Sequence, residues 1–206
     1  MTFKETVLAL SLLLLSRGAF AAVGCDLNEP DRDVARLFPG ATYKTRYLSL
    51  KTSGGQLLLE RVEKRLGDKF HGLYETIDVP YTLYDIYKGT QAVGYIHGVN
   101  QKGEYGGIQV FLALDTSGKI KSFYIQKLTS RAAKDLRAKE FGAQFEGLSL
   151  KDFEAYDPAA AKAPAGSSSA GIKAPAKAGK DFNSVMRAVK KNLILMDEFV
   201  LSKKEK

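Results

Sequence analysis

Residues 92–128 indicate the fold most clearly, and they read AVGYIHGV (92–99), NQKGEYGG (100–107), IQVFLAL (108–114), DTSG (115–118) and KIKSFYIQKL (119–128). Three runs in this stretch are rich in β-branched and aromatic residues, and short polar segments with glycine separate them. Such a pattern is typical of consecutive antiparallel strands. The DTSG segment has the turn chemistry of a hairpin. We therefore predict an α+β fold whose centre is an antiparallel β-meander.

Helical periodicity is strongest near the C-terminus. Val185, Val189, Leu193 and Met196 recur at helical spacing behind Asp181, a residue suited to an N-cap. This pattern predicts a C-terminal helix over residues 181–201 that packs against the sheet. We predict one or two further helices that pack against the sheet. Helical spacing of apolar residues is seen at 31–38, at 56–66 and in a run after Leu128. In the last of these, Thr129 or Ser130 can serve as N-cap. Further strands are expected at 43–50, 70–79 and 81–87.

The order of these segments predicts one domain with several appendages. Residues 1–21 have a lysine, an apolar run and Ala19-Phe20-Ala21, which is typical of a secretory signal peptide. Residues 157–180 are rich in Ala, Pro, Gly, Ser and Lys, so they bury too little apolar surface to offset their ordering entropy. The predicted units are a signal peptide (1–21), a flexible N-terminal arm (22–33), the main part of the domain (34–156), a flexible loop (157–180), the C-terminal helix of the same domain (181–201) and a basic tail (202–206).

Cys25 is the only cysteine, which excludes an intramolecular disulfide. It follows Ala22-Val23-Gly24, a weak match to the motif that precedes a lipidated cysteine. Two alternatives stay open, soluble export with cleavage after Ala21 and a lipid anchor at Cys25. Both predict a periplasmic or otherwise extracytoplasmic protein, secreted by its signal peptide and, with the anchor, associated with the membrane.

The formal net charge is +8 at pH 7, which suits an anionic ligand, a lipid surface or an acidic protein partner, although we favour solubility as its explanation. We predict no nucleic-acid partner, because an exported chain without a recognisable binding module gives no support for one. The two histidines, His71 and His97, lie in separate segments, and the sequence has no cluster with metal-ligand spacing. No nucleophile elbow or Walker loop is present either.

Two stretches have both a structural and a functional interpretation. Tyr74, Tyr81, Tyr84 and Tyr87 either line half-buried strand faces or form an aromatic wall beside a flat ligand. Thr129, Ser130 and Arg131 either open an ordinary capped helix or hold a phosphate at its N-terminus.

Several motifs resemble the FMN-binding domain found in exported components of sodium-translocating NADH:quinone reductases and of Rnf electron-transport complexes. They cover roughly residues 34–200. The matching segments are Leu37–Ala41, Val93–Ile96, Tyr105–Asp115 with Gly118–Ile120, Phe141 with Gln144–Gly147, and Val185 with Ala188, Val189 and Leu193.

The chain departs from this family at its covalent flavin motif. The family has Ser-Gly-Ala-Thr before the terminal helix, and its threonine can carry FMN through a phosphoester bond. The corresponding residues here are Ala176-Lys177-Ala178-Gly179, so glycine stands in place of the threonine. After the third central strand, Thr129-Ser130-Arg131 likewise keeps only the threonine of the family's glycine-rich loop. The resemblance is therefore to a divergent member without the flavinylation motif, which argues against covalent FMN.

The resemblance implies an exported accessory to electron transfer in the cell envelope, with non-covalent FMN if any. The flavin ring would then lie against Gly106 and Gly107, with the phosphate near Thr129, Ser130 and Arg131. An envelope redox complex or another membrane protein complex would be the partner. The alternative is a cofactor-free binding or assembly module on the same scaffold.

Overall fold

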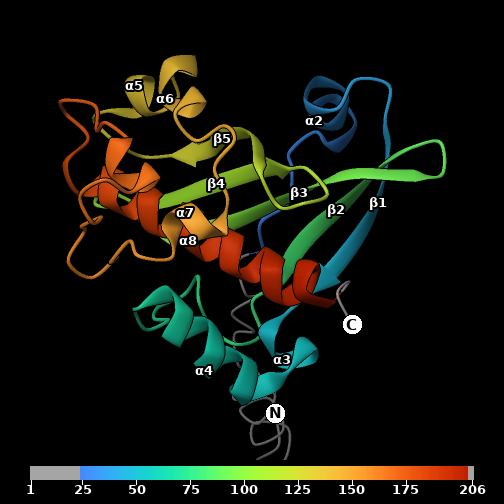
Figure 1. Ribbon diagram of the computed structural model, residues 1–206, viewed down its shortest axis with the longest axis horizontal. Coiled ribbons are helices and arrows are strands. Elements are labelled where there is room, and N and C mark those ends of the chain that lie inside the picture. Colours follow the sequence, from blue (N-terminus) through green and yellow to red (C-terminus); the bar gives the residue numbers. More distant parts are fainter. Residues whose placement is uncertain (1–23, 204–206) are drawn as a thin grey trace, which may run out of the picture.

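The computed structural model describes residues 24–203 (Figure 1). The predicted signal peptide and the last three residues of the predicted tail lie outside this range. A sheet forms the centre of the structure, with helices on both of its faces. Within the described residues, no helix combines the length and the apolar character needed to cross a membrane.

The sheet is an antiparallel meander in which the strands lie side by side in chain order. Its turn at residues 115–118 closes as predicted, because Asp115 Oδ1 accepts hydrogen bonds from the backbone N–H groups of Ser117 and Lys119. The predicted meander and the α+β fold class are confirmed. The strands are β1 (Thr42–Leu48), β2 (Tyr81–Lys88), β3 (Gln91–Lys102), β4 (Gly107–Leu114) and β5 (Ile120–Leu128).

Helix α8 (Gly179–Phe199) crosses one face of the sheet and closes the larger core (Figure 1). The four apolar residues of its predicted stripe are all buried. Helix α4 (Gly55–Leu66) lies beside α8, and Arg65 forms ion pairs of 2.6 Å with Asp197 and 2.7 Å with Glu198. The helix predicted from periodicity therefore does roof the sheet.

The opposite face of the sheet carries a second, smaller core, to which the N-terminal arm and helix α2 (Pro30–Leu37) contribute. Cys25 is 1% exposed in this core, and burial raises the pKa of its thiol well above the ordinary value. Leu27 N–H donates to the Tyr84 hydroxyl at 3.1 Å, and Asn100 Nδ2 donates to the Gly24 carbonyl at 2.9 Å. The mobility of residues 22–33 stays a prediction, but residues 24–27 are packed into the sheet.

The remaining elements are short, and most of them lie in the segment between β5 and α8. Residues 157–180 have little regular structure, yet they contact the domain: Lys173 N–H donates to Gln144 Oε1 at 2.8 Å, and Ser168 Oγ donates to Asp152 Oδ1 at 2.7 Å. Their mobility also stays a prediction. The short helices are α3 (Leu50–Ser53), α5 (Ala133–Leu136), α6 (Lys139–Ala143), α7 (Leu150–Phe153), η1 (Ser168–Gly171) and η2 (Leu201–Lys203).

Three local predictions were wrong. Asp181 does not cap the C-terminal helix, because α8 begins at Gly179 and Asp181 lies in its first turn. The strand predicted at 70–79 is a loop, because Glu75 turns inward to bond the backbone N–H of His71 at 3.1 Å while Gly72 adopts a φ of +74°. The helix predicted to follow Leu128 is reduced to the four residues of α5. Ser130 Oγ accepts the Ala132 N–H in a local turn, so neither Thr129 nor Ser130 caps a longer helix.

Gly94 is a tight point in the sheet, where β3 passes β4 and Phe38. A Cβ atom at this position would overlap the Leu114 carbonyl oxygen and would lie 2.8 Å from the Phe38 ring. Because a backbone atom cannot move aside cheaply, we expect Gly94→Ala to destabilise the fold by about 1–3 kcal/mol or more. Urea unfolding measures this, and Gly171→Ala is the control, since a Cβ there would have no atom within 4 Å. Equal unfolding midpoints for the two variants would contradict the expectation.

Candidate functional site

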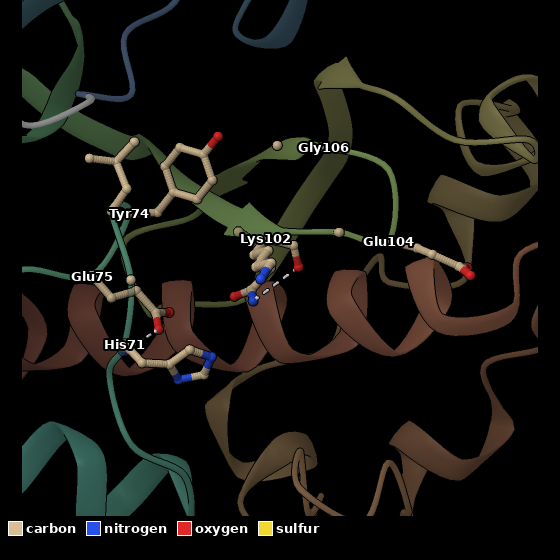
Figure 2. Close-up of a pocket in the computed structure, with 11 residues that line it drawn as sticks. His71, Tyr74, Glu75, Lys102, Glu104 and Gly106 are labelled. Carbon is tan, nitrogen blue, oxygen red and sulfur yellow. Dashed lines mark hydrogen bonds between the residues drawn. The ribbon is translucent and has the colours of Figure 1, made fainter.

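A cleft lies at the end of the sheet where β3 turns into β4. Its first part, the hairpin hollow, has a volume of about 370 Å³ and lies between loop residues 71–75 and hairpin residues 101–104 and 106–107. Tyr74 extends towards the strand end that carries Gly106, and Glu75 turns towards α8 (Figure 2). The hollow thus has an aromatic wall on one side and the hairpin backbone on the other.

Three glycines keep the hairpin backbone close to its neighbours. A Cβ on Gly107 would lie 2.7 Å from the Tyr74 hydroxyl, and one on Gly103 would lie 2.8 Å from Asp181 Oδ1. A Cβ on Gly106 would lie 3.2 Å from Thr129. Glycine at these three positions therefore permits close packing, and the backbone of Gly103, Gly106 and Gly107 lines the hollow.

The four tyrosines singled out in the sequence divide between the two interpretations. Tyr81 and Tyr84 are buried in the cores, and the Tyr87 ring lies 5.6 Å from Lys44 Nζ. Tyr74 is the member of the group that lines the hairpin hollow. The structural interpretation thus holds for three of the four, and Tyr74 is placed to contact a flat ligand.

The second part of the cleft, the strand hollow, has a volume of about 440 Å³ and lies by the start of β4 and the end of β5. It shares Tyr74 and Gly107 with the hairpin hollow. Its charged lining residues are Lys127 and Arg137, and its lining includes no carboxylate among the residues that the structure describes. The remaining lining residues are Asn100, Ile108, Gln109, Gln126, Leu128 and Thr129.

Of the five residues proposed from the sequence as cofactor contacts, three line the cleft and two do not. Gly106, Gly107 and Thr129 line the cleft. Ser130 lines neither hollow, and the Arg131 guanidinium lies 5.2 Å from the Tyr105 ring instead. The arginine that lines the strand hollow, together with Lys127, is Arg137, further along the chain.

A buried charge cluster supports the loop that forms the aromatic wall. Glu75, Arg187 and Lys191 are 5%, 6% and 0% exposed, and both cations donate to Glu75 Oε1. Arg187 also donates to Asp68 Oδ2 at 2.6 Å and to Gln101 Oε1 at 2.7 Å. The cluster therefore ties loop 68–75 to both α8 and β3.

Ionisation in this cluster is strongly perturbed. Burial opposes the charged form of Glu75, but the charges of Lys191 and Arg187 outweigh it and lower the pKa of Glu75 to about 2. Burial lowers the pKa of Lys191 to about 8, although Glu75 acts in the opposite direction. No local pattern in the sequence indicates this cluster, because Glu75 lies more than a hundred residues from Arg187 and Lys191.

The start of α8 carries no hydroxyl that could serve as a covalent handle. Gly179 is the first residue of the helix. Asp181, which is 1% exposed, accepts the Glu104 N–H at 2.8 Å through Oδ1. The helix N-terminus is thus joined to the hairpin by a side-chain carboxylate of the chain itself.

Potential metal ligands are scattered in the part of the chain that the structure describes. Residues 24–203 contain no group of three or more His, Cys, Asp or Glu side chains placed to hold a metal ion. His97 is fully buried in the larger core, where Nδ1 lies 2.8 Å from Asn192 Oδ1.

Comparison with solved structures finds the crystal structure of NqrC from Shewanella oneidensis. The TM-score is 0.56 at 14% sequence identity, and the match covers 96% of this chain and 100% of that chain. This chain has the NqrC fold. Searches against protein-family models and curated proteins gave no match. The likeness to NqrC confirms the fold that the sequence resemblance implied, while the chemistry of the cleft rests on its own lining residues.

Proposed function

We propose that this protein binds FMN non-covalently and serves as an accessory to electron transfer in the cell envelope. The observation that supports this most directly is the hairpin hollow, which combines the Tyr74 wall with the bare backbone of Gly103, Gly106 and Gly107. A flat aromatic ring needs such a slot, because it gains contact area from both of its faces. The NqrC fold and the sequence resemblance to an FMN-binding domain make FMN the first ligand to test.

The residues present fit a non-covalent flavin and do not fit a covalent one. Gly179 offers no oxygen for a phosphoester bond at the start of α8. When bound, the flavin itself supplies the redox chemistry. The chain's own residues would orient the ring, exclude water from one side through Tyr74, and hold the wall in place through the Glu75 cluster.

Export by the predicted signal peptide and a partner in an envelope redox complex belong to the same proposal. The net charge of +8 favours a partner with an acidic surface. We further propose soluble export over a lipid anchor, because the Cys25 thiol lies in the second core. An acyl chain on Cys25 would require the arm to leave that core.

The proposal is tested by the absorption spectrum of the exported chain, recorded before and after denaturation and again after FMN is added back. A flavin band that is released by denaturant, or that is shifted when FMN is added back, would support the proposal. We expect Tyr74→Ala to weaken FMN binding and Tyr87→Ala, a substitution outside the cleft, to leave it unchanged. A band that stays with the chain would contradict non-covalent binding, and FMN that never binds would contradict the function.

A cofactor-free binding or assembly module is the second candidate. The contact between Asp181 and the Glu104 N–H favours it, because a buried carboxylate in the first turn of α8 binds the hairpin beside the place where the family's flavin handle would stand. Failure of added FMN to bind the exported chain is the result that would select this candidate.

A further inference from the structure

The ends of α8 and β5 offer two different environments for a phosphate group. The N-terminus of a long helix attracts anions through its free N–H groups and its dipole. In this chain the buried Asp181 carboxylate already lies in the first turn of α8 and binds the hairpin. A phosphate placed there would lie close to this second anion.

The strand hollow has the opposite electrostatic character. Lys127 and Arg137 line it, and no carboxylate among the described residues does. Thr129 adds a hydroxyl donor to the same lining. A dianionic phosphate monoester therefore meets two cations in the strand hollow and a carboxylate at the start of α8.

Arg137 is held in a defined orientation. Its Nε donates to the Ile125 carbonyl at 3.1 Å and its Nη2 donates to the Gln126 carbonyl at 3.0 Å. A guanidinium fixed in this way loses little further side-chain entropy when it binds a phosphate. The two bonds to the end of β5 thus pre-organise a cation beside the hollow.

The strand hollow is also adjacent to the ring site. Tyr74 and Gly107 line both hollows, and because the Tyr74 hydroxyl packs closely against Gly107, this contact forms the boundary between them. A ligand with its ring against Tyr74 in the hairpin hollow would pass its chain over this contact. Its phosphate would then lie by Lys127 and Arg137.

We propose that the strand hollow is the phosphate seat of the flavin, with Lys127 and Arg137 as its cations. This inference rests on the proposed function and deepens it, because it makes the ligand class a flavin monophosphate and moves the phosphate away from the α8 terminus. It also replaces Arg131, the cation expected from the sequence, by Arg137.

The test compares the affinities of FMN and riboflavin for the exported chain, measured by flavin fluorescence. Because riboflavin lacks the phosphate, we expect FMN to bind at least about tenfold more tightly to the wild-type protein. Lys127→Gln, at an exposed position, should bring the two affinities together by weakening FMN binding alone. Arg137→Gln should do the same, and its thermal unfolding is recorded because Arg137 also bonds β5.

Two substitutions serve as matched controls. Arg131→Gln removes the neighbouring arginine, and Lys121→Gln removes another exposed lysine of β5; both should keep the preference for FMN. Equal affinities of the wild-type protein for FMN and riboflavin would overturn the inference while leaving the proposed function intact. The same holds if Arg131→Gln abolishes the preference and Lys127→Gln does not. If neither flavin binds, the proposed function fails and the phosphate seat fails with it.

Discussion

Glu75→Gln is expected to destabilise the protein by about 3–5 kcal/mol, because it removes the anion that pairs with two buried cations. Arg187 and Lys191 both donate to Glu75, and each is less than a tenth exposed. Glutamine has nearly the same shape, so the loss is electrostatic and leaves no cavity. Urea unfolding at neutral pH measures it, through the midpoint and slope of the transition.

The matched control is Glu29→Gln, which removes a carboxylate from the exposed Arg32–Glu29 ion pair. Surface pairs contribute about 0–1 kcal/mol, so this variant should unfold close to the wild type. In the double variant Glu75→Gln/Lys191→Met, part of the stability should return, because Arg187 keeps Asp68 as an anionic partner and the buried charge of Lys191 is gone. If the two glutamine variants unfold alike, the cluster does not hold loop 68–75 to α8.

Acidification from pH 6.5 to pH 4 is expected to lower the free energy of unfolding by about 3 kcal/mol through His97 alone. Burial lowers the pKa of His97 from 6.5 to about 4, the Asn192 bond opposes this shift, and the charge of Lys191 adds to it. Between these two values the unfolded chain binds a proton that the folded chain does not. Stability therefore falls as pH drops through this window and loses nothing more from His97 below it.

The measurement is the urea midpoint across this pH range for the wild type and for His97→Gln. The variant should show a flatter profile between pH 6.5 and pH 4, whatever its stability at neutral pH. Below about pH 4.5 a further loss belongs to Glu75, because its folded pKa of about 2 lies below its ordinary value of 4.5. His71→Gln, at an exposed histidine, is the control and should follow the wild-type profile. A His97→Gln profile as steep as that of the wild type would contradict this assignment.

The parts of the fold that follow from local chemistry were predictable. The alternation within residues 92–128 and the turn residues between its runs indicate the meander. The apolar spacing of 185–196 indicates α8. Both signals arise within a few residues of chain, since strand and helix periods are local properties. The loop at 70–79 was missed because its conformation depends on Glu75, whose ion-pair partners Arg187 and Lys191 lie more than a hundred residues away.

The candidate site was predictable only in outline. Gly106, Gly107 and Thr129 line the cleft, and the absence of a hydroxyl at Gly179 is plain from the sequence. Arg131 and Arg137 both lie in a basic run after β5, and no local pattern distinguishes the one that lines the strand hollow. The same is true of Tyr74 among four neighbouring tyrosines.

The meander, the helix over the sheet and the glycine at position 179 follow from the chain alone, because periodicity, turn chemistry and side-chain identity exist before the chain folds. The burial of polar groups, in contrast, depends on the packed fold. Lys191 reads as a surface lysine, yet it is fully enclosed because Glu75 and the carbonyl of Asn100 meet it in the core. A charged side chain can be buried only where other segments of the chain supply its hydrogen-bonding and ionic partners. Contacts between distant segments cannot be predicted from a local stretch of sequence.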